Sequence, residues 1–126
     1  MRFEYKHFAF LGVESQRAAE ASECANEQDM FWPYHDTIFL NQRGENQGFW
    51  SQRVLEEFAV KLGMDEAAFS ECMDEGRYGD AIQAAYEVAG SRGVDHTPTV
   101  YVNGEEVPSG APLEVYIQMI EAALGR

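Results

Sequence analysis

The stretch that decides the fold is Gly93-Val94-Asp95-His96-Thr97-Pro98-Thr99-Val100-Tyr101-Val102-Asn103-Gly104, in which a Thr-Pro step enters a short apolar strand that ends in Asn-Gly. Proline cannot donate to a β-ladder, so Pro98 belongs at a strand start, on a sheet edge or in a turn, and a cis bond there would fix a tight bend. Asn103-Gly104 is typical of a type I′ hairpin turn, after which Glu105-Glu106-Val107 returns as the second strand. The stretch predicts a β-hairpin entered through a proline bend.

The residues before and after the hairpin carry one strand pattern and several helix patterns. A strand is predicted over Arg2 to Leu11, where alternating polar and aromatic residues lead into an apolar run. About five helical segments should follow, and their start signals are Glu14-Ser15, Asp29 before a start near Phe31, Ser51, Asp65 and Gly79. A last helix should begin at Pro112 and bury a face made of Leu113, Ile117, Ile120 and Leu124. This order is that of an α/β domain with a long helical insertion.

Length, hydropathy and charge narrow the class of protein. A chain of 126 residues supports one domain with one core, and no apolar run is long enough for a membrane span. The 22 acidic residues against 9 basic ones give a net charge of −13, which repels nucleic acid and anionic membrane surfaces. The acidic surface is either simply solvated or attracts a basic partner. No signal-peptide pattern is present, which predicts the cytoplasm for the chain as it stands and the periplasm or the cell exterior if a leader was removed.

Four further stretches accompany the Thr97-Pro98 strand: Phe8 to Gly12, Ala18 to Ala25, Phe31 to Asp36 and Cys72 to Tyr78. Together they resemble the DsbA-like branch of the thioredoxin superfamily, in which the Thr-Pro step is the cis-proline loop that faces the redox cysteines. The resemblance covers nearly the whole chain. It implies a thioredoxin-like α/β fold in a single domain, residues 1–126, with a helical insertion at about residues 15–92.

The family's catalytic motif is not found in this sequence. In the family, a Cys-x-x-Cys pair opens a helix on the segment before the strand that is predicted here from Met1. The 126 residues hold no such motif, and Cys24 and Cys72 are too far apart in sequence to form one. The resemblance therefore implies a domain truncated at its N-terminus, without the first strand and the catalytic helix. Because that strand is central in the family's sheet, we predict that the gap closes or, in preference, that a homodimer fills it.

Cys24 and Cys72 match a second cysteine pair that many DsbA-like relatives carry in the helical insertion. The resemblance implies a structural disulfide; two buried thiols and a redox-active pair are the alternatives. Closing a loop of this length stabilises a fold by about 4 kcal/mol, less any strain. Two cysteines are too few for a zinc site, and His7, His35 and His96 lack metal-ligand spacing, so we predict neither a metal nor a cofactor.

Thr97 and Pro98 carry the functional hypothesis. In the family, the residue before the cis-proline offers backbone groups to an extended substrate, which is a form of strand addition. The resemblance therefore implies that Thr97 and Pro98 bind peptide, and that His96, at a position where relatives commonly have glycine, lies beside that groove. The structural alternative is that Pro98 serves only the hairpin bend and that His96 is an exposed loop residue.

Three functions remain open from the sequence. The first is a DsbA-like protein without redox cysteines, a self-associating module that binds an extended peptide or protein partner through His96, Thr97 and Pro98, with no catalytic residue. The second is a thiol–disulfide oxidoreductase that works with a partner's cysteines or by cycling Cys24 and Cys72. The third is a glutathione-dependent transferase or isomerase of the related kappa branch, whose N-terminal catalytic segment is equally absent. Whether the chain is an enzyme is thus undecided at this point.

Overall fold

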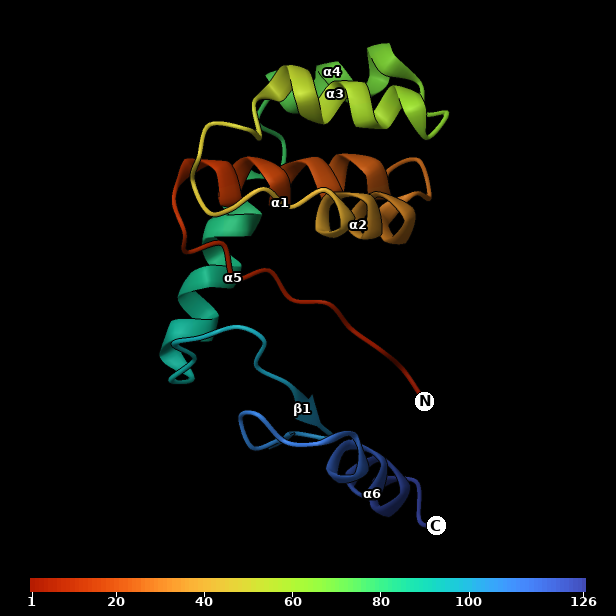
Figure 1. The fold of residues 1–126 in the computed structure, drawn as a ribbon, viewed down its shortest axis with the longest axis vertical. Coiled ribbons are helices and arrows are strands. Elements are labelled where there is room, and N and C mark those ends of the chain that lie inside the picture. Colours follow the sequence, from red (N-terminus) through yellow and green to blue (C-terminus); the bar gives the residue numbers. More distant parts are fainter. The chain divides into compact units, whose positions relative to one another are not determined.

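The computed structural model describes residues 1–126 and contains six helices and one two-stranded sheet (Figure 1). In chain order the elements are α1 (Val13–Asn26), α2 (Phe31–Leu40), α3 (Gln52–Lys61), α4 (Glu66–Asp74), α5 (Gly79–Ser91), β1 (Tyr101–Val102), β2 (Glu105–Glu106) and α6 (Leu113–Ala123). The α/β fold and the order of five helices, a hairpin and a last helix agree with the prediction, whereas the strand predicted before them is absent. The chain divides into two compact units, Lys6–Val88, here called the helical unit, and Met1–Tyr5 with Ala89–Arg126, here called the hairpin unit.

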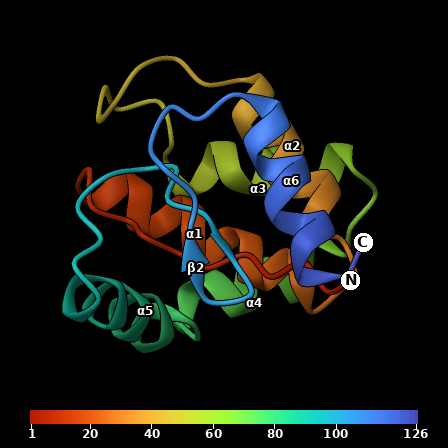
Figure 2. The same ribbon diagram turned by 90° about the horizontal axis from the view of Figure 1, so that it is seen from below.

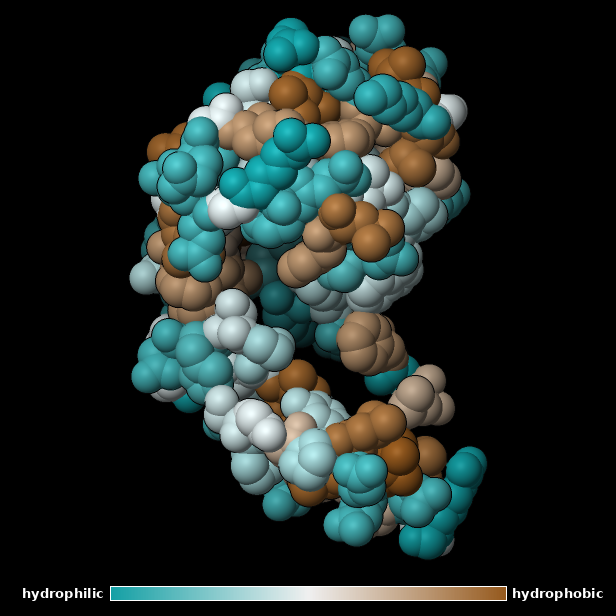
Figure 3. Space-filling model, in the orientation of Figure 1, coloured by the Kyte–Doolittle hydropathy of each residue, from teal (hydrophilic) through white to brown (hydrophobic).

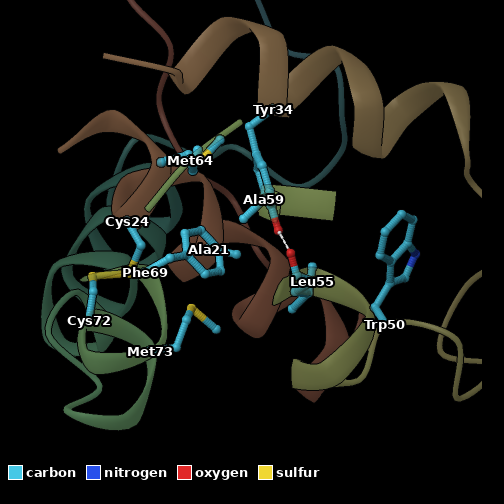
Figure 4. Close-up of a cluster of buried hydrophobic side chains, with 11 residues drawn as sticks. Ala21, Cys24, Tyr34, Trp50, Leu55, Ala59, Met64, Phe69, Cys72 and Met73 are labelled. Carbon is cyan, nitrogen blue, oxygen red and sulfur yellow. Dashed lines mark hydrogen bonds between the residues drawn. A yellow bond between two sulfur atoms is a disulfide. The ribbon is translucent and has the colours of Figure 1, made fainter. Parts of the chain in front are cut away.

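The core of the helical unit forms around α1, which lies against α2, α3 and α4 (Figure 1). Ala21 and Ala25 on α1 are fully buried, and their small side chains let the neighbouring helices approach closely. The buried cluster in this unit consists of Ala21, Cys24, Ala25, Tyr34, Trp50, Leu55, Ala59, Met64, Phe69, Cys72 and Met73 (Figure 4). The helices α1 to α4 thus enclose one continuous apolar core.

Tyr34 is the polar member of this core. Its side chain is fully buried, and its hydroxyl donates a hydrogen bond of 2.8 Å to the backbone carbonyl oxygen of Leu55 (Figure 4). Burial, followed by the nearby negative charge of Glu56, raises the pKa of Tyr34 well above its ordinary value. The phenol therefore stays protonated in the fold and ties α2 to α3.

Two predicted helix caps are confirmed. The Ser51 hydroxyl accepts a hydrogen bond from the Val54 backbone N–H at the start of α3, and the Asp65 carboxylate accepts one of 2.8 Å from the Ala68 N–H at the start of α4. Both side chains satisfy backbone donors that a first helical turn leaves without partners.

The other two predicted caps are wrong. Glu14 lies inside α1, and its carboxylate accepts hydrogen bonds from the Gly48 N–H and, at 3.4 Å, from the Trp50 N–H, both far along the chain. Asp29 lies in the turn before α2 and adopts a φ of 57°, which differs from the extended backbone typical of an N-cap residue. Met30 takes the capping position instead, without a side-chain hydrogen bond.

The hairpin unit contains the predicted β-hairpin (Figure 2). β1 and β2 are antiparallel, with Tyr101 opposite Glu106 and Val102 opposite Glu105. Asn103 and Gly104 have φ values of 50° and 87°, the two positive angles that a type I′ turn requires. The ladder continues past the strands, because the Val107 N–H donates a hydrogen bond of 2.8 Å to the Val100 carbonyl oxygen.

The last helix begins where predicted, but its predicted buried face is wrong. Pro112 is the N-cap of α6, yet Leu113, Ile117 and Leu124 are 69%, 45% and 43% exposed. The helix packs on β1 through a neighbouring part of its apolar arc, where the half-buried residues are Val115, Tyr116, Met119 and Ile120. The apolar face of α6 is wider than the area that a two-stranded sheet can cover, so its remaining side chains lie at the surface (Figure 3).

The strand predicted over Arg2 to Leu11 is also wrong, because this segment contains no β-structure. A strand exists only as part of a ladder, since its backbone groups need a neighbour to bond. The one sheet in the structure consists of β1 and β2. The alternating pattern therefore indicates β-propensity, but the segment is not part of the sheet.

Candidate functional site

The predicted peptide-binding residues lie on the segment that leads from α5 into β1. Thr97 and Pro98 are exposed, His96 is half-buried, and the Thr97–Pro98 peptide bond is cis. The Thr99 hydroxyl donates a hydrogen bond of 2.7 Å back to the His96 carbonyl oxygen. The three residues therefore share one short loop, closed by Thr99 and open to solvent at Thr97 and Pro98.

One edge of β1 is open. β1 pairs with β2 alone, and Val100 turns its carbonyl oxygen toward β2, where it bonds Val107. In an antiparallel pair, consecutive residues turn their backbone groups to opposite edges, so Thr99 and Tyr101 direct their N–H and C=O groups to the outer edge. No backbone hydrogen bond reaches that edge. The loop and the outer edge together present a row of donors and acceptors beginning at Pro98.

His96 is engaged with its neighbour in sequence. Its Nδ1 atom lies 2.8 Å from a carboxylate oxygen of Asp95, whose side chain is 86% exposed. The hydrogen bond from His96, assisted by the charge of the ring, lowers the pKa of Asp95. The loop therefore carries an ionised carboxylate at its entrance.

The two cysteines lie in the helical unit and are bonded to each other. The disulfide joins Cys24 on α1 to Cys72 on α4 across a separation of 48 residues (Figure 4). Cys24 and Cys72 are only 2% and 1% exposed. A thiolate that attacks a disulfide must reach one of its sulfur atoms, so this bond is shielded from exchange and braces the core.

The structure thus puts His96, Thr97 and Pro98 into one loop and the cysteine pair into the other unit. Sequence reasoning missed Asp95 and the outward backbone groups of Thr99 and Tyr101. The signal for Asp95 was its place beside His96. The outward direction of the Thr99 and Tyr101 backbone groups could have been found by counting back from the Asn103-Gly104 turn, because consecutive residues of a strand direct these groups to opposite edges.

Comparisons with known proteins agree with the fold. The profile of the family described as Thioredoxin matches residues 1–122. Disulfide bond formation protein D of Bacillus subtilis is 24% identical over 98% of this chain and 57% of its own length. The crystal structure of oxidised BdbD from Bacillus subtilis matches with a TM-score of 0.84 at 23% identity, over 96% of this chain and 67% of that chain. The structural match establishes that the two chains share a fold.

Two membrane transporters also contain a similar stretch. The Na⁺/H⁺ antiporter NhaA 3 of Salinispora tropica is 31% identical to this chain, and NhaA 1 of Salinispora arenicola is 32% identical, each over 82% of it. The aligned stretch is only 16% of each antiporter's length. In the present chain, every helix falls short of the length and apolar character needed to cross a membrane.

Proposed function

We propose that this chain, which belongs to the thioredoxin family, is a DsbA-like protein that binds extended polypeptide segments. The segment would lie along the outer edge of β1, beside Thr97 and Pro98. The observation that carries this proposal is the open row of backbone groups on Thr99 and Tyr101. His96 would flank the bound segment from the same loop.

Strand addition would give binding without a strict dependence on the sequence of the peptide. An added strand can bond the N–H and C=O groups of Thr99 and Tyr101, and each such bond contributes about 0.5–1.5 kcal/mol net. Pro98 has no N–H, so it starts the row without leaving an unsatisfied donor. Main-chain bonds supply affinity for many sequences, while side chains near the edge supply preference.

A pair of substitutions at Tyr101 tests the proposal. Tyr101→Pro removes the N–H that faces the outer edge and leaves the β1–β2 ladder bonds in place, whereas Tyr101→Ala removes the ring and keeps that N–H. We expect Tyr101→Pro to lose binding of a fluorescein-labelled extended peptide, and Tyr101→Ala to retain it, in a fluorescence anisotropy titration. Circular dichroism of both variants checks the fold. Equal binding by the two folded variants would contradict strand addition.

A second candidate is thiol–disulfide exchange, favoured by the similarity to Disulfide bond formation protein D. The 126 residues contain no Cys-x-x-Cys motif, so the redox pair would come from another polypeptide segment or from Cys24 and Cys72. The burial of both cysteines argues against the second source. Insulin reduction by dithiothreitol, compared between the wild type and the Cys24→Ser, Cys72→Ser variant, separates these cases. A catalysed rate that disappears in the variant would show that the pair cycles.

Homodimer formation, which the sequence predicted, stays a prediction. A second copy and a peptide would compete for the same open edge of β1, so the two modes of association are linked. Light scattering over a range of concentrations measures the mass in solution. A mass of one chain at every concentration would contradict the dimer and leave the edge available to peptides.

A further inference from the structure

We infer that the outer edge of β1 selects extended peptides that carry lysine or arginine. This inference rests on the proposed peptide binding and names its substrate class. It follows from the charges that surround the edge and from the register of the hairpin.

The hairpin and the segments that flank it contain carboxylates and no strong base; the arginines of the hairpin unit, Arg2, Arg92 and Arg126, lie outside these segments. From Gly93 to Gly125 there is no lysine or arginine, whereas the acidic residues there are Asp95, Glu105, Glu106, Glu114 and Glu121. Glu105 and Glu106 are exposed on β2, and the Asp95 side chain is exposed at the loop entrance. A bound segment therefore meets a negative field without a positive group in the hairpin to offset it.

The register places a carboxylate on each face of the added strand. Glu106 lies opposite Tyr101, and Glu105 lies opposite Val102, so the two glutamates belong to opposite faces of the sheet. A peptide residue paired with the outer edge of Tyr101 shares a face with Glu106 and lies two strand spacings from it, about 10 Å between backbones. Lysine and arginine side chains are long enough to shorten that distance. Two consecutive basic residues of the peptide, which face opposite sides of the sheet, would thus each approach one carboxylate.

The charge of the whole chain favours such a peptide over a second copy of the protein. Each copy carries a net charge of −13, so two copies approach each other against repulsion. A basic peptide approaches with attraction, which raises the rate of encounter most at low ionic strength. Asp95 adds to the negative charge at the loop entrance, because the hydrogen bond from His96 lowers the pKa of its carboxyl group.

Three labelled peptides of equal length and β-propensity test the inference, one with two consecutive lysines, one with glutamines and one with glutamates at those positions. We expect the lysine peptide to bind the wild type about fivefold more tightly than the glutamine peptide, and the glutamate peptide to bind most weakly. The preference should shrink between about 0.01 M and about 0.15 M salt, as the screening length falls. Anisotropy titration measures all three affinities.

The double variant Glu105→Gln, Glu106→Gln should lose most of the preference for the lysine peptide. Its affinity for the glutamine peptide should be unchanged. The matched control is Glu45→Gln with Glu71→Gln, two exposed residues of the helical unit, which changes the net charge equally and should retain the preference. Equal binding of the three peptides, each still sensitive to Tyr101→Pro, would overturn the charge selection and keep the proposed function. No binding of any peptide, including the case of a stable dimer, would overturn both.

Discussion

The helical unit and the hairpin unit differ in how their apolar side chains are covered. Of the fourteen buried hydrophobic residues, only Val107 belongs to the hairpin unit. The helical unit contains the other thirteen and a disulfide, whereas Leu113, Ile117 and Leu124 on α6 lie at the surface. The comparison teaches that the buried core and the open strand edge belong to different units: the first unit contains the core, and the second contains the edge on which the proposed binding depends.

Loss of the disulfide should have the largest effect on this difference. Replacing Cys24 and Cys72 by alanine frees a loop that spans 48 residues, and we expect the free energy of unfolding to fall by about 4 kcal/mol. Urea denaturation measures the change. Wild-type protein reduced with dithiothreitol while unfolded, where the sulfur atoms are accessible, is the control, because it loses the same cross-link without a change of sequence. Unchanged unfolding midpoints in both samples would show that the core does not depend on the cross-link.

A matched pair of leucines compares the two units directly. Leu55→Ala removes a fully buried side chain from the helical core and should cost about 3 kcal/mol. Leu113→Ala makes the same change on α6, where the side chain is 69% exposed, and should change stability by less than about 0.5 kcal/mol. Thermal and urea unfolding of both variants give the values. Similar costs at the two sites would mean that α6 is covered in solution, for example by a second copy.

Tyr34→Phe probes the single polar link inside the helical core. The substitution leaves the buried Leu55 carbonyl without its hydrogen-bond donor, and we expect a loss of about 1–2 kcal/mol. Phe69→Leu is a useful comparison, because it alters a contacting ring and keeps the hydrogen bond. A Tyr34→Phe variant as stable as the wild type would show that the carbonyl finds another donor.

The same tyrosine predicts how stability depends on alkaline pH. Its pKa is raised in the fold, so above about pH 10 the unfolded chain loses this proton first. The contribution of Tyr34 is complete below that pH and is lost as the pH rises. Urea midpoints measured from neutral to alkaline pH should therefore fall less steeply in Tyr34→Phe than in the wild type. Parallel curves would contradict the assignment.

The smallest effect is expected at Glu27, on the surface of the helical unit. Both of its carboxylate oxygens accept hydrogen bonds from Arg77, at 2.8 and 2.6 Å, and one accepts a bond from the Tyr78 hydroxyl at 2.7 Å. These bonds lower the pKa of Glu27, so its contribution is present above its ordinary range and is lost as the pH falls through it. Glu27→Gln should cost less than about 1 kcal/mol at neutral pH, and nothing in acid. A cost that persists in acid would show a role other than charge.

Local signals in the sequence were enough for much of the fold. The caps at Ser51 and Asp65 and the Asn103-Gly104 turn depend on residues within four positions of one another, and all three are confirmed. The Cys24–Cys72 pairing was different, because only the resemblance to the DsbA-like proteins indicated it. For the site, the sequence located the loop at Thr97 and Pro98 but not the outward edge groups, which depend on how the hairpin pairs.

Three of the wrong predictions concern contacts between residues that are distant in the sequence, which sequence periodicity does not reveal. The pattern over Arg2 to Leu11 indicates a strand but not whether a ladder is present. The apolar arc of α6 indicates a covered face but not which part the small sheet covers. Glu14 has the composition of a cap, yet its carboxylate bonds the backbone at Gly48 and Trp50. In each case the outcome depends on residues distant in the sequence.

The bonds from Glu14 to Gly48 and Trp50 have a practical consequence for protein engineering. They anchor the C-terminal end of the polar loop between α2 and α3, while the exposed residues from Arg43 to Asn46 lie before that anchor. Chain inserted between Gly44 and Glu45 would lengthen the loop without moving the anchored end, and doubling a loop costs only about 0.6 kcal/mol in closure entropy. This position is therefore suited to carry an epitope or a fluorescent reporter, so that a partner of the hairpin can be followed without labelling the hairpin itself.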